Sequence, residues 1–158
     1  MYSQTLRQLF LVMHLSGLAL MAGTTVSAFV IFRAFQNKLT SEGKGSASHV
    51  KLLSTLAPVK GIGGILLILS GIGLVFITGG VFLHMRWLQF KLILILLLPL
   101  NEILIGNKQL KKLKVAFSEN SPNNTTGLAT TVSPLNIFYT VQLLLFCGII
   151  FLAVFKFN

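Results

Sequence analysis

A single titratable side chain, His14, lies inside an uncharged stretch near the start of the chain. Between Arg7 and Arg33 the sequence holds 25 residues without a formal charge, and a membrane-spanning helix needs roughly 20. An imidazole in such a segment is costly unless it has a partner, so it marks either a functional site or a hydrogen bond to a neighbouring helix. The residues that share its face on a helix are Gly17, Leu18, Met21, Thr25 and Ala28. Small residues in this set let another helix or a flat ligand approach closely.

Several cations lie at the depth of His14 or nearer the membrane surface. His14 follows Arg7 by seven residues, about 10 Å of helix rise, and Lys91 follows Arg86 by five residues, about 7 Å. Arg86 belongs to a very short polar break, so the flanking apolar spans form an antiparallel hairpin. His84 belongs to the same break. The spacing therefore predicts that His14 and Lys91 lie at similar depths on different helices.

This combination of side chains suits a b-type heme. Imidazole binds iron, glycine admits the flat macrocycle, and Lys or Arg pairs with the propionates. We therefore expect His14 to be an iron ligand and Gly17 to adjoin the ring. Arg7 and Arg86 would lie near the acidic groups, and His84 would be a second iron ligand.

The elements that must position these residues are transmembrane helices. The chain has 158 residues, of which 54% are hydrophobic and 10% are charged, a composition far from that of a soluble domain. The apolar segments predict an all-α fold, an integral membrane four-helix bundle forming a single transmembrane domain (1–158). The predicted spans are about 5–35, 59–83, 87–106 and 135–155, and the predicted cytoplasmic loops are 36–58 and 107–134.

The formal charge of +10 is placed for lipid contact and topology control, and it does not indicate nucleic-acid binding. Nine basic residues lie in or next to the two predicted loops, and four lie on the opposite side of the membrane. The nine are Arg33, Lys38, Lys44, Lys51, Lys60, Lys108, Lys111, Lys112 and Lys114. Because cytoplasmic loops carry the excess of Lys and Arg, we expect a multi-pass protein of the bacterial inner (plasma) membrane with both termini outside the cytoplasm.

A resemblance to a known family rests on two of the four predicted spans. The run RWLQFKLILILLLPLNEILIGNKQLKKL resembles the third helix of the four-helix, heme-containing membrane protoporphyrinogen oxidases, which are related to copper-resistance D-like membrane proteins. The matching positions are Trp87, Leu88, Lys91, Gly106, Lys111 and Lys112. His14 stands at the place of that family's first-helix histidine, with Gly23 further along.

The resemblance implies a role in heme ligation for His14 and an essential, catalytic role for Lys91. The chain departs from the family at two places. The aromatic residues that usually follow the first-helix histidine are missing, and Asn101-Glu102 replaces a histidine late in the third helix.

Three functions are compatible with these residues. The first is a b-type heme protein that transfers electrons to a membrane redox partner or oxidises a porphyrinogen, with His84 acting within the chain or across a homo-oligomer. The second is a non-enzymatic oligomeric or accessory protein packed through glycine stripes. The third is copper handling, because Met13-His14 and His84-Met85 are soft-ligand pairs. Adjacent residues on a helix point in different directions, which weakens the third.

Two further charged residues receive predictions. Lys60 is expected to reach the lipid headgroups from the start of the second span. Glu102, which follows Pro99, is expected either to serve a proton path from the cytoplasmic side or to reach the surface and pair with Lys108.

Overall fold

The described chain is helical throughout. This computed structural model describes residues 2–42, 46–118 and 125–155, and within them no strand occurs. The elements are α1 (Tyr2–Glu42), α2 (Ala47–Ile77), the 3₁₀ turn η1 (Val81–His84), α3 (Arg86–Asn101), the π-helical turn η2 (Glu102–Gly106), α4 (Asn107–Ser118) and α5 (Thr125–Val154). Because α3, η2 and α4 follow one another without a break, they form one continuous helix.

Four helical segments are long and apolar enough to cross a membrane. They are Gln4–Ser41, Ala47–Ile77, Arg86–Val115 and Val132–Val154, and they contain 18-residue windows with mean hydropathies of 1.9, 2.1, 2.0 and 2.4. In lipid every backbone N–H and C=O must be paired within the protein, and a helix does this within one segment. The predicted fold class, an all-α integral membrane four-helix bundle, is confirmed.

The helices extend beyond the predicted spans. α1 continues past residue 35 to Glu42, and α2 begins at Ala47 and contains Pro58, so most of segment 36–58 is helical. Likewise, α4 occupies the start of segment 107–134, while residues 119–124 lie outside the described part of the chain. Hydropathy reports the apolar length of a segment, whereas a helix continues for as long as its backbone bonds and packing support it.

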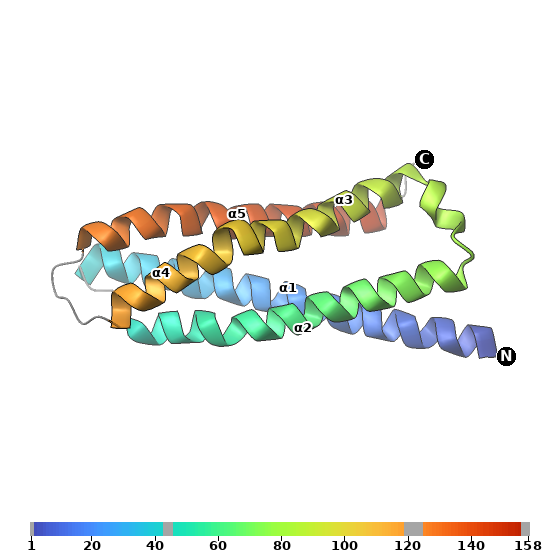
Figure 1. Cartoon of the computed structure of the whole chain (residues 1–158), viewed down its shortest axis with the longest axis horizontal. Helices are drawn as coiled ribbons and strands as arrows, with labels where there is room; N and C mark the ends of the chain where they lie inside the picture. The colour runs from blue at the N-terminus through green and yellow to red at the C-terminus, as the bar shows by residue number, and fades with distance from the viewer. Residues whose placement is uncertain (1, 43–45, 119–124, 156–158) are drawn as a thin grey trace.

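The helices form two pairs, which Figure 1 shows as α1 beside α2 and α3 beside α5. We call the end where η1 joins α2 to α3 the hairpin end; α1 begins there and α5 ends there. The opposite end, where α2 begins and α4 ends, is the loop end. The pairs meet through contacts of α1 with α5 and of α2 with α4, and within the described chain α3 makes no close backbone contact with α1 or α2.

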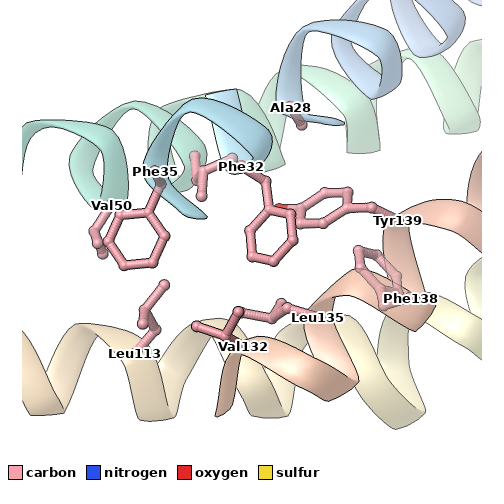
Figure 2. Close-up of a cluster of buried hydrophobic side chains, with 10 residues drawn as sticks. Ala28, Phe32, Phe35, Val50, Leu113, Val132, Leu135, Phe138 and Tyr139 are labelled. Carbon is pink, nitrogen blue, oxygen red and sulfur yellow. The ribbon is translucent and has the colours of Figure 1, made fainter. Parts of the chain in front are cut away.

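The main hydrophobic core lies toward the loop end (Figure 2). Phe32 and Phe35 of α1 are fully buried there, as are Leu113 of α4 and Leu135 of α5. The Phe32 and Tyr139 rings pack with their centroids 5.0 Å apart. The core draws on both helix pairs, so it fixes them together at this end.

Packing becomes looser toward the hairpin end. A smaller cluster of Leu98, Phe146 and Ile149 lies along α3 and α5. Beyond it, none of the side chains described in segments 4–16 and 71–97 is buried. The apolar side chains there are left to contact lipid or a bound group.

Candidate functional site

His14 sits at the seam between α1 and α2, where a serine holds it. Its Nδ1 lies 3.0 Å from Oγ of Ser70, a residue of α2 that is fully buried. The Ser70 hydroxyl in turn donates to the carbonyl of Leu66, 2.5 Å away in the preceding turn. The ring also lies against Gly71, where a Cβ would be 3.5 Å from His14 Cε1, an ordinary van der Waals distance.

These hydrogen bonds favour one tautomer of the His14 imidazole. Because Ser70 donates its hydroxyl hydrogen to Leu66, its oxygen is left to accept a hydrogen from Nδ1 of His14. We therefore assign the tautomer with Nδ1–H and a lone pair on Nε2. A histidine oriented through one nitrogen while the other keeps its lone pair is the usual arrangement of a metal-binding imidazole.

Lys91 is the predicted site residue that the fold brings near His14. Its charge is close enough to act on the His14 imidazole, although α3 makes no close backbone contact with α1. The side chain of Lys91 is half-buried.

The other predicted site residues lie apart from His14. Arg7, Arg86 and His84 are exposed at the hairpin end, and within the described chain η1, which contains His84, makes no close backbone contact with α1. Among the described residues no three His, Cys, Asp or Glu side chains gather as a metal site.

Gly17 serves helix packing. It is buried, and a Cβ built on it would lie 2.9 Å from the carbonyl oxygen of Gly63 and from the backbone nitrogen of Leu67. The close approach predicted at this position is therefore made by α2, and the backbone of α2 occupies the space in which the macrocycle was expected.

The residues at the hairpin end fit a heme in part. His14 offers an oriented lone pair, Lys91 offers a cation, and the apolar side chains around them are incompletely packed. Gly17 does not fit, because it is covered by α2. Of these residues, His14 would hold the iron and Lys91 would pair with a propionate.

A second polar centre, which the sequence analysis did not predict, lies nearer the loop end. The ammonium of Lys60 in α2 donates to Oε2 of Glu102 at the start of η2. Their side chains are 12% and 23% exposed. Lys60 was expected to reach the headgroups, and Glu102 either to serve a proton path or to reach the surface and pair with Lys108. Instead of Lys108, Glu102 pairs with Lys60, and the pair links α2 to the α3–α4 helix. The sequence feature that could have predicted this pair is the presence of opposite charges in two separate apolar spans.

A small cavity adjoins this pair. Its volume is about 20 Å³, enough for one water molecule by the criterion of roughly 10–15 Å³ per water. Four of its lining residues are polar or ionisable, namely Thr24, Lys60, Glu102 and Tyr139, and the remainder are apolar or glycine. All four membrane-spanning helices contribute to the lining.

An amide pair continues the polar centre toward the hairpin end. Nδ2 of Asn101 donates to Oε1 of Gln142, 2.9 Å away, and to the carbonyl of Phe138. Gln142 is 1% exposed, and its Nε2 has no partner in the described structure. Buried donors of this kind are normally satisfied by protein or by ordered water.

No protein-family model, no curated protein and no solved structure matches the chain.

Proposed function

We propose that this multi-pass membrane protein binds a b-type heme at the hairpin end of its bundle, with Nε2 of His14 as an axial ligand, and that it transfers electrons. The observation that carries the proposal is the hydrogen bond from Nδ1 of His14 to the buried Ser70, which orients the imidazole and leaves the Nε2 lone pair. The heme would supply reversible one-electron chemistry.

The chain's own residues have distinct tasks in this proposal. Ser70 fixes the tautomer and the angle of the imidazole. Lys91 offsets the negative charge of a propionate within the apolar bundle, and the exposed Arg7 and Arg86 bind acidic groups that extend toward the surface. His84 would complete the iron coordination from a second copy of the chain, since η1 lies apart from α1.

The resemblance to membrane protoporphyrinogen oxidases extends the proposal to a reaction. By that resemblance Lys91 would be the catalytic residue, acting on a porphyrinogen whose electrons leave through a membrane redox partner. The expected setting is the bacterial inner membrane with both termini outside the cytoplasm, as the distribution of basic residues indicates.

Hemin titration of the detergent-purified protein tests the proposal. Wild type is expected to bind about one hemin per chain with a sharpened Soret band, and His14→Ala to lose this binding. Ser70→Ala keeps the His14 imidazole but removes the hydrogen bond that orients it. We therefore expect the affinity for hemin to fall about 10–100-fold, as for other residues that orient a metal ligand.

His49→Ala is the matched control, because His49 lies at the loop end in the first turn of α2, and it should bind hemin like wild type. If His14→Ala binds hemin as well as His49→Ala does, the proposal is wrong. The non-enzymatic accessory role would then be the better account.

A further inference from the structure

The Lys60–Glu102 ion pair is partly buried and lies between two apolar clusters. On its loop-end side is the core of Phe32, Phe35 and Leu113, and on its hairpin-end side is the cluster of Leu98 and Phe146. Lys60 also lies over the Phe138 ring, with Nζ 5.4 Å from the centroid. The pair is therefore held in apolar surroundings at the place where α2 meets the α3–α4 helix.

Stability alone does not account for this pair. Removing two charges from water costs free energy that their attraction barely returns, so apolar residues of similar volume usually stabilise a protein equally well or better. Ionisable groups within membrane segments are rare and mark proton or ion pathways by default. Only three acidic residues occur in the whole chain, and one of them is placed here.

The backbone is specialised at the same place. Glu102 begins the π-helical turn η2, which interrupts the α-helix three residues after Pro99. Single π-turns within α-helices are frequent at functional sites. At the end of this turn, Gly106 lets the Phe138 ring come so close that a Cβ there would lie 2.7 Å from Cζ. The turn thus presents Glu102 to Lys60 across a closely packed junction.

The cavity beside the pair is suited to water, and a buried donor without a partner lies further along α5, outside the cavity lining. The cavity beside the pair has room for one water molecule, and it offers the hydroxyls of Thr24 and Tyr139 in addition to the two charges. The buried Nε2 of Gln142, one helical turn along α5 from Tyr139, is a donor without a partner in the described structure. Water would satisfy such groups.

We propose that Lys60 and Glu102, with the adjoining cavity, form a hydrated proton-binding site inside the bundle. A hydronium ion that reaches the cavity transfers its proton to a Glu102 carboxylate oxygen, leaving a water molecule and a neutral carboxylic acid beside the Lys60 ammonium. The reverse transfer returns the proton to water. No electrons are exchanged.

The surroundings of the pair select a proton over other ions. The Lys60 ammonium opposes any added positive charge, but a proton forms a bond to a single Glu102 oxygen, whereas a metal cation would need several oxygen ligands. The Glu102 carboxylate opposes binding of an anion. The groups that face the pair from the other helices are the Thr24 hydroxyl of α1 and the Tyr139 phenol of α5, and the α4 lysines are not among the cavity-lining residues. Glu102 is thus the proton acceptor of this centre.

Infrared spectroscopy tests the proposal directly, because the only other acidic side chains are Glu42 and Glu119. In a Glu42→Gln/Glu119→Gln background, Glu102 is the sole side-chain carboxylate. On acidification of the folded protein we expect the absorption of one protonated side-chain carboxyl per chain to appear reversibly, in addition to that of the terminal carboxyl. Further substitution by Glu102→Gln should abolish that signal, leaving only the terminal carboxyl.

A second variant separates the site from the fold. Lys60→Met/Glu102→Gln removes both charges together, so it should keep the helical circular dichroism of wild type while lacking the infrared signal. The proposal is overturned if the Glu102 carboxylate band persists until helicity is lost. It is overturned equally if, in the Glu42→Gln/Glu119→Gln background, the doubly neutral variant keeps the full protonated-carboxyl signal and does not lose the part assigned to Glu102.

Discussion

Gly17 and Gly23 lie on the same helix but in opposite surroundings. Gly17 is in contact with the backbone of α2, whereas a Cβ at Gly23 would meet nothing within 4 Å. The sequence shows both as glycines in an apolar span and does not distinguish them. The difference arises from which face of α1 meets α2, a property that depends on two segments about 45 residues apart.

Substitution by alanine should reveal this difference. Gly17→Ala places a methyl group 2.9 Å from two backbone atoms of α2, so the helices must separate, and we expect a loss of about 1–3 kcal/mol in the free energy of unfolding. Unfolding in mixed detergent micelles with increasing sodium dodecyl sulfate, followed by circular dichroism, measures it. Gly23→Ala is the matched control and should be neutral; equal effects at both positions would contradict the α1–α2 packing described above.

The partners of single residues were the least predictable part of the site. His14 and Lys91 could be singled out because a titratable group in an apolar span is conspicuous. Ser70, which orients His14, looked like one small residue among the glycines of the second span. The sequence suggested partners for Lys60 and Glu102 that lie close to each of them, namely the headgroups and Lys108. The two residues instead pair with each other, although they are 42 positions apart in sequence.

At the scale of elements, the α3–η2–α4 helix shows what hydropathy does and does not reveal. The apolar run after Trp87 correctly predicts a spanning helix. The basic segment that follows continues as α4, in which Leu113 is fully buried while Lys111, Lys112 and Lys114 are exposed. The average composition of such an amphipathic segment is polar. Average hydropathy therefore does not show that one face of α4 packs against the rest of the bundle.

Two leucines of this continuous helix provide a matched comparison. Leu113 is 0% exposed and Leu104 is 55% exposed. Leu113→Ala leaves a cavity in the loop-end core and should lower the free energy of unfolding by about 2–5 kcal/mol. The Leu104 side chain faces lipid, so Leu104→Ala should lower the free energy of unfolding by less than about 1 kcal/mol. Detergent unfolding curves measure both changes, and similar values for the two variants would show that α4 does not pack on the core as described.

At the scale of the whole molecule, the bundle is closed at one end and loosely packed at the other. The loop-end core joins both helix pairs, and the Lys60–Glu102 pair lies next to it. Toward the hairpin end no described side chain of segments 4–16 and 71–97 is buried. The sequence predicted the fold class because apolar length decides it. The uneven packing could not be predicted, because it depends on how far the two helix pairs diverge.

This unevenness places the proposed heme site in the part of the molecule that has apolar side chains available and an oriented histidine beside them. The proposed proton site lies in the closed half. His14 and Thr24 are ten residues apart on α1, about 15 Å of helix rise, so the two sites occupy separate levels of the bundle.

The absorption spectrum of the protein as purified from membranes, before and after dithionite, tests the central claim most directly. The account predicts a Soret band that sharpens on reduction together with split α and β bands, and the loss of both in His14→Ala. A wild-type protein that is colourless as isolated and stays colourless after hemin is added would contradict it.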